Sequence, residues 1–371
     1  MKIVVCPDSF KGTVPSYRAA EIVKTAALSV VPEAAVVTVP LADGGEGTCD
    51  ALGAKKIRVR VAGSDGTPTD SFYGVLGDVA VIELASAAGL SQTSFHDPSL
   101  TTTYGVGELF VAAAEAGFRK FVLALGGSGT NDCGCGMASA CGVRFCDAGG
   151  EAFIPVGGTL ELVSRIDVSR LDPRIAESEI TVMCDVDNPL LGERGAARVF
   201  APQKGADAAA VELLEEGARS VASVINRDLG IDVSAIPGGG AAGGCGAGAV
   251  AFLGAKLMRG IDAILDAVGF DALLEDADLA VTGEGRFDAT SADGKVVSGV
   301  ASRALKHEVP VAIVCGVAEE GAEKLIPGVT GAFPTLRGTP PAVITPEEAE
   351  KSLYKTAVEM IKAVISRGGV S

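Results

Sequence analysis

The amino-acid sequence predicts an α/β fold with a parallel, doubly wound sheet. Short apolar runs of strand length alternate with segments of helical periodicity at both ends of the 371-residue chain. Glycine-rich polar segments follow several of these runs, as connections in such sheets commonly do. Apolar residues make up 48% of the chain, which is enough to form substantial cores. We therefore expect a globular protein throughout.

The expected elements follow from periodicity and end signals. Residues 2–6 and 35–39 resemble strands, and residues 16–30 have helical spacing with Ser16 as a plausible N-cap. The C-terminal part repeats this alternation. Strands are expected at 279–282, 309–314 and 331–336, and helices at 298–306 and 346–366.

The middle of the chain differs from its ends. Residues 57–85 indicate short antiparallel strands interrupted by the turn sequence SDGTPTD. The chain also exceeds the length of about 250 to 300 residues at which one core usually divides, so we expect two domains. A Rossmann-like domain would combine residues 1–55 with 276–371, and a mixed α/β domain, 56–275, would be inserted between them. The active site is expected in the cleft between the two.

Charge and cysteine usage narrow the class of protein. A net charge of −16 disfavours a nucleic-acid partner, since binding polyphosphate needs clustered Lys and Arg. The sequence shows no signal peptide and no apolar run of membrane-span length. Nine cysteines in apolar contexts argue against a disulfide framework and for the cytoplasm. A zinc site at Cys133, Cys135, Cys141 and Cys146 is disfavoured by their spacing.

Four polar segments come where strand-like runs end. They are DGGEG (43–47), LALGGSGTNDCGCGM (123–137), CDVDNP (184–189) and TGEGRFD (282–288). Ligands sit at the carboxyl ends of strands in open α/β sheets. Glycines there let backbone N–H groups approach phosphate, and carboxylates there can hold Mg²⁺.

Each segment also has a purely structural interpretation. Asp43 and Glu46 could cap a helix that begins near Thr48, and for this segment alone that interpretation is favoured. For residues 126–136 a functional interpretation is favoured, because four hydrogen-bonding side chains fall within five positions. Asp185 and Asp187 share one side of an extended segment, where two unscreened carboxylates would be costly without a cation.

Other motifs carry less weight. Gly238, Gly240 and Gly243 satisfy G-x-G-x-x-G, but no convincing strand precedes them, so close helix packing is favoured. The P-loop pattern is absent from the sequence. With only two histidines, a histidine-based triad is disfavoured and the available bases are carboxylates.

The motifs together resemble those of the type-1 glycerate kinases, in order and over essentially the whole chain. The resemblance rests on PDSFKG, PLADGGEGT, IELASAAGL, TTTYGVGEL, LALGGSGTNDCGCGM, CDVDNPLLGERGAARVFAPQKGA, PGGGAAGGCGAG and TGEGRFD. It implies a two-domain α/β protein that uses ATP to phosphorylate D-glycerate, usually to 2-phosphoglycerate, with 3-phosphoglycerate as the other product. Thr290 stands where the family commonly has Gln, and Cys133 and Cys135 where small residues are usual.

With this resemblance, the polar segments acquire expected roles. Phosphoryl transfer needs in-line positioning, charge neutralisation and a group that orients the attacking hydroxyl. The expected substrate-binding residues are Asp8, Ser9, Lys11, Asp43 and Arg286. The expected phosphate- and nucleotide-binding residues are Gly44, Gly45, Gly127, Ser128, Thr130 and Asn131. Asp187 and Glu284 are the candidates for Mg²⁺, Lys11 for offsetting charge, and Asp185 or Asp288 for the base.

Two alternatives stay open at this stage. A non-catalytic sensor that keeps the fold would bind glycerate or nucleotide without turnover. An aspartyl phosphatase is disfavoured, because its Asp-x-Asp would lie at the first strand and CDVD lies mid-chain. The enzyme is expected to act as a monomer or a homodimer, with no nucleic acid and no membrane as partner.

Overall fold

The computed structural model describes residues 1–371 except 11–12, 42–46, 93–95, 293–295, 337–343 and 367–371. The chain forms two compact units. The terminal unit comprises residues 1–43, 50–53 and 261–371, and the inserted unit comprises 44–49 and 54–260. The expected domain division near residues 56 and 276 stays a prediction.

The terminal unit is built on a five-stranded sheet in which all neighbouring strands are parallel. The strand order is β14-β13-β12-β1-β2. Its strands are β1 (Lys2–Val5), β2 (Ala35–Thr38), β12 (Leu279–Phe287), β13 (Val311–Ala318) and β14 (Val329–Pro334). Its helices are α1 (Ser16–Val30), α10 (Gly260–Ala267), α11 (Phe270–Leu274), α12 (Val296–Lys306) and α13 (Pro346–Ser366).

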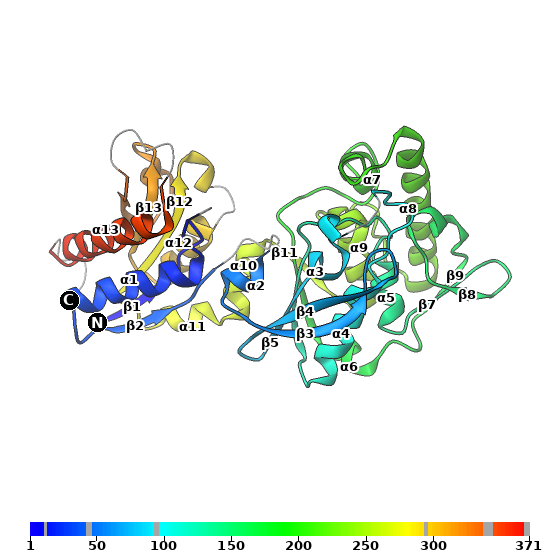
Figure 1. Cartoon of the computed structure of the whole chain (residues 1–371), viewed down its shortest axis with the longest axis horizontal. Helices are drawn as coiled ribbons and strands as arrows, with labels where there is room; N and C mark the ends of the chain where they lie inside the picture. Colours follow the sequence, from blue (N-terminus) through cyan, green and yellow to red (C-terminus); the bar gives the residue numbers. More distant parts are fainter. Residues whose placement is uncertain (11–12, 42–46, 93–95, 293–295, 337–343, 367–371) are drawn as a thin grey trace. The chain divides into compact units, whose positions relative to one another are not determined.

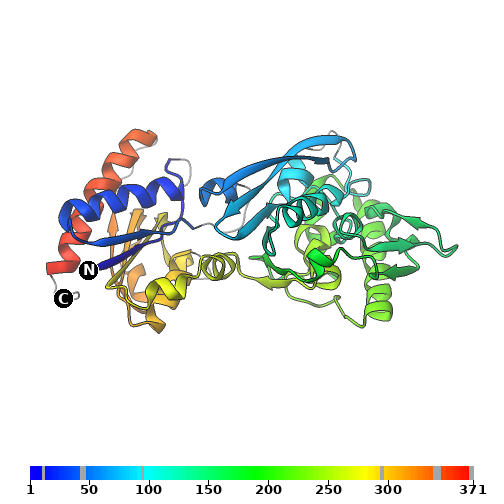
Figure 2. The ribbon, with the colours of Figure 1, turned by 90° about the horizontal axis from the view of Figure 1, so that it is seen from below.

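Helices cover both faces of this sheet. Alternate strand residues such as Ile3, Val281 and Val314 form one apolar cluster with the inward faces of α1 and α13. Figure 1 shows these two helices side by side. Helix α12 packs against β12 and β13, and right-handed crossovers place it on the opposite face, as Figure 2 shows. Chain segments from both ends of the sequence therefore share one core.

The strand order reverses between β1 and β12. From β1 the chain moves outward to β2, whereas β12, β13 and β14 extend in the other direction. Such a topological switch point is where open α/β sheets bind ligands, outside the carboxyl ends of the strands. The carboxyl ends of β1 and β12 are therefore the expected binding edge of this unit.

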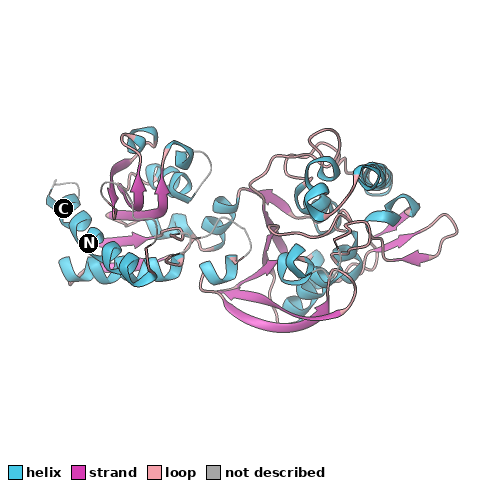
Figure 3. Ribbon diagram, turned by 45° about the horizontal axis from the view of Figure 1, so that its top comes forward, coloured by secondary structure: helices cyan, strands magenta, loops and turns pink. Residues whose placement is uncertain are grey.

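The inserted unit contains a six-stranded mixed sheet of order β11-β10-β6-β5-β4-β3. Strands β5, β6, β10 and β11 are parallel neighbours, while β3–β4 and β4–β5 are antiparallel. Figure 3 shows the long, curved β3–β4 ribbon at one edge. The bounds are β3 (Lys55–Ala62), β4 (Pro68–Leu76), β5 (Val79–Glu83), β6 (Lys120–Ala124), β10 (Glu179–Met183) and β11 (Lys256–Met258).

The remaining elements of the inserted unit include a small three-stranded sheet of order β8-β7-β9. Its strands are β7 (Arg144–Cys146), β8 (Ala152–Phe153) and β9 (Arg165–Asp167). The helices are α3 (Ala85–Ala88), α4 (Tyr104–Glu115), α5 (Cys135–Ala140), α6 (Pro173–Ala176), α7 (Ala196–Phe200), α8 (Ala208–Leu229) and α9 (Ala241–Leu253). The short helix α2 (Thr48–Ala51) precedes β3.

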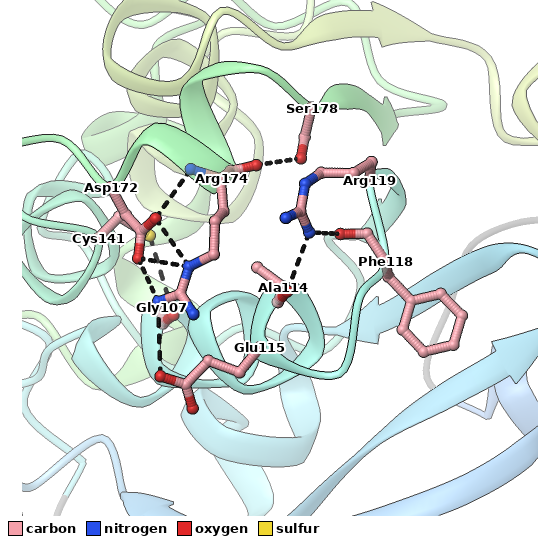
Figure 4. Close-up of polar contacts among 9 residues, drawn as sticks. All are labelled: Gly107, Ala114, Glu115, Phe118, Arg119, Cys141, Asp172, Arg174 and Ser178. Atoms are coloured by element: carbon pink, nitrogen blue, oxygen red, sulfur yellow. Dashed lines mark hydrogen bonds and ion pairs between the residues drawn. The ribbon is translucent and has the colours of Figure 1, made fainter.

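Polar contacts join the short helix α6 to α4. Asp172 caps α6 by accepting a hydrogen bond from the N–H of Arg174 at 2.9 Å. The guanidinium of Arg174 pairs with the same carboxylate at 2.6 Å and reaches Glu115 of α4 at 3.4 Å, as Figure 4 shows. The hydrogen bonds from Arg174 hold the pKa of Asp172 below its usual range.

The expected fold class, α/β with a parallel sheet and a second, mixed α/β part, is confirmed. Two local expectations are wrong. Ser16 is not an N-cap: Pro15 occupies that position, and the Ser16 hydroxyl donates to the carbonyl of Pro7 at 2.7 Å. Strand β12 does not end at Thr282, because pairing with β13 continues to Phe287. Residues Gly283 and Gly316 allow this, since a Cβ there would meet backbone oxygens at 2.0 and 2.3 Å.

Candidate functional site

The switch point of the terminal unit joins the ends of β1 and β12 directly. The N–H of Asp8 donates to the carbonyl of Gly283 at 2.8 Å, and the hydroxyl of Thr282 donates to the carbonyl of Cys6 at 2.9 Å. Asp8 and Ser9 are half-buried there, next to the buried Glu284. Three predicted site residues thus lie at one edge of the sheet. Lys11 lies outside the described residues.

Arg286 and Asp288 follow along the same segment. The Nε of Arg286 donates to Oδ2 of Asp288 at 3.0 Å, with the Arg286 side chain 76% exposed and Asp288 19% exposed. By the period of two along β12, Arg286 shares a face of the strand with Glu284. An arginine this exposed, held by one carboxylate, is available for an anionic substrate.

The loop after β6 is the most buried polar segment of the inserted unit. Ser128 is 9% exposed, and Thr130, Asn131 and Asp132 are fully buried. The loop pairs with the turn after α3: the N–H of Gly129 donates to the carbonyl of Ala88 at 2.9 Å. A Cβ on Gly129 would lie 3.0 Å from Cα of Leu90, so this glycine is required for packing. Glycines in this loop were expected to let backbone N–H groups approach phosphate. The N–H of Gly129 is already bonded to Ala88, so that reason does not apply to it.

Asp132 organises the end of this loop. Its carboxylate accepts hydrogen bonds from the N–H and the hydroxyl of Thr103 at 2.7 and 2.8 Å. It also accepts from the N–H groups of Gly134 and Gly136 at 3.0 and 3.1 Å. Burial raises the pKa of the Asp132 carboxyl, and these four hydrogen bonds oppose that shift. Asp132 therefore supports the loop from inside and does not face a ligand.

The glycine-rich start of α9 packs against the same loop from behind. The N–H of Cys133 donates to the carbonyl of Gly243 at 3.1 Å. Gly243 has a positive φ of 66°, and a Cβ there would lie 2.1 Å from the carbonyl oxygen of Thr130. A Cβ on Gly240 would likewise lie 2.2 Å from the carbonyl oxygen of Pro189. The glycines of the G-x-G-x-x-G match thus serve close packing, as the sequence indicated.

Two polar groups at this loop set it apart from an ordinary turn. The side-chain amide of Asn131 is buried, and neither its oxygen nor its nitrogen has a hydrogen-bond partner among the described residues. Lys204, which is 2% exposed, donates to the carbonyl of Thr130 at 2.6 Å and to Ser128 Oγ at 3.3 Å. Sequence reasoning missed Lys204. Lysine side chains are mostly exposed, so nothing in the segment APQKGA pointed to the burial of this one.

The two aspartates after β10 lie at the carboxyl edge of the parallel strands, as expected, but they are exposed. Asp185 accepts a hydrogen bond from the N–H of Gly260 at 2.8 Å. Asp187 is 74% exposed and pairs with Arg194 at 2.5 Å. The expectation of two mutually unscreened carboxylates is therefore wrong. Solvent and Arg194 screen them instead.

The segment DGGEG is only partly described. Asp43, Gly44, Gly45 and Glu46 lie outside the described residues. The N–H groups of Gly47 and Cys49 donate to the carboxylate of Glu83 at 3.0 and 2.6 Å, and Glu83 is 4% exposed. Glu83 ends β5, so it ties the chain after DGGEG to the carboxyl edge of the same sheet. Sequence reasoning did not single out Glu83, although it is the second residue of the motif IELASAAGL.

Metal and cysteine chemistry are limited within the described part of the chain. There, no three His, Cys, Asp or Glu side chains gather as a metal site. All nine cysteines are free, so the expected lack of a disulfide framework is confirmed. None of the described helices has both the length and the hydropathy to cross a membrane.

Comparison with known proteins decides the family. The sequence model described as the glycerate kinase family matches residues 3–365. The chain belongs to the glycerate kinase family. A glycerate kinase from Halalkalibacterium halodurans is 42% identical over 376 residues, covering 98% of both chains. A glycerate 2-kinase from Escherichia coli is 42% identical over 325 residues, covering 85% of both.

A solved structure agrees with this family. A crystal structure from Salmonella typhimurium LT2, assigned as a glycerate kinase 2, superposes with a TM-score of 0.88 at 38% identity and covers 100% of both chains. The expectations of an enzyme and of this family are confirmed. The roles of individual site residues stay predictions.

Proposed function

We propose that this chain transfers the γ-phosphoryl group of ATP to D-glycerate and yields 2-phosphoglycerate. The observation that carries the proposal is the family match over residues 3–365, together with the Escherichia coli relative named glycerate 2-kinase. The buried polar loop after β6 supports it, because an unbonded amide at Asn131 and a buried cation at Lys204 suit an anionic ligand.

The proposed roles are those that the polar motifs and the family resemblance imply. Ser128, Thr130 and Asn131, with Gly127, contact phosphate oxygens of the nucleotide. Lys11, Asp8, Ser9 and Arg286 bind glycerate, with Lys11 and Arg286 facing its carboxylate. Asp43, Gly44 and Gly45 complete the substrate and phosphate contacts.

Mg²⁺ is assigned to Asp187 and Glu284. Carboxylate oxygens are the ligands that Mg²⁺ prefers, and it commonly takes only one or two of them beside water and phosphate. Asp187 and Glu284 each supply a ligand of this kind, although no three His, Cys, Asp or Glu side chains gather as a metal site among the described residues. When bound, the ion neutralises charge on the phosphate oxygens.

The reaction then needs little covalent work from the protein. A hydroxyl oxygen of glycerate attacks the γ-phosphorus, and the bond to the β,γ-bridging oxygen breaks as ADP leaves. Asp185 or Asp288 accepts the hydroxyl proton. Of the two, Asp288 lies beside Arg286, which orients its carboxylate at 3.0 Å. Attack by the 2-hydroxyl yields 2-phosphoglycerate, and attack by the 3-hydroxyl yields 3-phosphoglycerate.

A coupled assay of ADP formation tests the proposal across D-glycerate, L-glycerate, hydroxypyruvate and tartronate, followed by phosphorus NMR of the product. We expect turnover with D-glycerate that requires Mg²⁺, and a phosphomonoester signal from the 2-position. A signal from the 3-position would correct the product alone. Binding of glycerate or nucleotide with no turnover at any acceptor would support the sensor alternative instead.

A further inference from the structure

Lys204 is held in one place by its backbone. It ends the 3₁₀ turn Pro202–Lys204, and its N–H donates to the carbonyl of Ala201 at 3.0 Å. The next residue, Gly205, has a positive φ of 105°, and a Cβ there would lie 2.1 Å from the carbonyl oxygen of His96. A side chain at position 205 would therefore collide with the backbone of His96, so the two segments can approach this closely only with glycine there.

The charge of Lys204 is not neutralised by an ion pair. Within the described chain, no carboxylate oxygen lies within 4.0 Å of its Nζ, and its two hydrogen-bond acceptors are neutral oxygens. Burial lowers the pKa of Lys204 to about 8, opposed by the nearby Asp132 and Cys245. A buried cation without a paired anion is costly unless a ligand supplies the negative charge.

The hydrogen bonds of Ser128 show how the Lys204 ammonium group affects its hydroxyl. Its Oγ accepts from Nζ of Lys204 at 3.3 Å and from the N–H of Thr130 at 3.2 Å, which fills both lone pairs. What remains is the hydroxyl hydrogen. Within the loop it can reach only Thr130, whose Oγ1 and carbonyl oxygen lie at 3.2 and 3.4 Å, both long for O–H donors.

We propose that Lys204 is a positioning residue that makes Ser128 a hydrogen-bond donor to an anionic oxygen, a phosphate oxygen of the nucleotide or the carboxylate of the acceptor acid. Ser128 is 9% exposed, compared with 2% for Lys204 and 0% for Thr130, so the ligand meets Ser128 while Lys204 acts from beneath. The filled lone pairs also exclude Ser128 as a ligand to Mg²⁺. The inference rests on the proposed kinase function.

The test compares Lys204→Met, Ser128→Ala and the double variant in the full-length enzyme. We expect each single change to raise KM for one substrate by about tenfold or more, with the double variant changing little further, because the two residues act as a unit. A raised KM for ATP assigns the oxygen to phosphate, and a raised KM for glycerate assigns it to the carboxylate. Lys204→Arg should recover part of the loss, since it restores the cation.

Proton uptake gives a readout that a merely structural role would not move. At pH 8 a bound anion should favour the protonated form of Lys204, so binding should take up a proton from the buffer. Calorimetric titration of the wild type in buffers of different ionisation enthalpy measures this uptake. We expect it with the same substrate whose KM rises in the variants. Lys204→Met should abolish that uptake. Lys120→Met, at an exposed lysine paired with Asp78, is the surface control and should match wild type.

The outcomes separate this inference from the proposed function. Unchanged KM values in Lys204→Met and Ser128→Ala in an active enzyme, or no proton uptake by wild type, would overturn the role of Lys204 alone. No turnover by wild type with any acid would overturn the kinase proposal. If Lys204→Met does not fold, the KM values of Ser128→Ala and the proton uptake of the wild type still test the role of Lys204.

Discussion

Gly243 lies so close to Thr130 that a Cβ atom on Gly243 would stand 2.1 Å from the carbonyl oxygen of Thr130. That same oxygen accepts the hydrogen bond from Lys204 at 2.6 Å. The start of α9 and the buried lysine therefore hold the loop after β6 from two elements far apart in sequence. Packing and the candidate phosphate contacts depend on the same few atoms.

Gly243→Ala should disrupt both stability and activity. The added Cβ forces the backbone at Thr130 to move, beyond the cost of a positive φ for alanine, so we expect a loss of roughly 3 kcal/mol or more. Gly254→Ala is the matched control, since Gly254 also has a positive φ but a Cβ added there would meet no neighbouring atom within 4 Å. It should lose only about 1 kcal/mol and keep wild-type KM. Equal effects in urea unfolding would contradict the crowding argument.

Lys204→Met should change how stability depends on pH. The pKa of Lys204 is lowered from 10.5 to about 8 in the folded protein, so the charged lysine opposes folding below pH 8. That cost disappears as pH rises from about 8 to 10.5, where the folded protein has released the proton and the unfolded chain has not. The wild type should gain on the order of 3 kcal/mol relative to Lys204→Met over this window. Parallel unfolding curves from pH 7 to 10 would contradict it.

Glu83→Gln should impair activity more than stability. One carboxylate oxygen accepts from Gly47 and the other from Cys49, and an amide can accept at only one of these positions. The expected loss is about 1 to 3 kcal/mol, and the chain that follows DGGEG loses an anchor. We expect kcat/KM to fall about tenfold or more, measured in the coupled assay at a temperature where both proteins are folded.

Asp172→Asn is the control for that change, because the Asp172 carboxylate also accepts a hydrogen bond from a backbone N–H but lies at α6 (Figure 4). It should cost about 1 kcal/mol at neutral pH and leave kcat unchanged. The pKa of Asp172 is lowered by its hydrogen bonds from Arg174, so its contribution is present above the unfolded pKa and is lost as pH falls below it. An activity loss equal to that of Glu83→Gln would mean that both act through global stability.

Asp187→Asn tests the metal assignment. Asp187 is exposed, and among the described residues its ion pair is with the exposed Arg194, so its removal should leave the melting temperature nearly unchanged. If its carboxylate binds Mg²⁺, turnover should fall by orders of magnitude and the Mg²⁺ concentration for half-maximal rate should rise. Arg194→Ala, which frees Asp187, should keep its activity. If Asp187→Asn retains more than about a tenth of wild-type turnover at saturating Mg²⁺, Asp187 is not a metal ligand.

Periodicity predicted the main helices and strands at the two ends of the chain, but it did not predict the long helix α8 of the inserted unit. Helices α1 and α13 begin and end where spacing placed them, because each has one apolar face that must be buried. The end of β12 could not be predicted this way. Its continuation through Glu284 and Arg286 depends on backbone pairing with β13, and polar side chains at an open edge do not reveal such pairing.

For the candidate site, the sequence by itself determined which segments are polar and glycine-rich, and its motifs were sufficient to indicate the family. It placed Ser128, Thr130 and Asn131 in one loop because they are neighbours in the chain. Only the tertiary structure brought Lys204 beneath that loop from 74 residues away, and set Gly243 behind it. It also showed that Asp187 is exposed and paired with Arg194, which the alternation of residues in CDVD does not report. Periodicity reports which side of one element is apolar, whereas the partner of a buried charge is chosen by packing between elements that are distant in sequence.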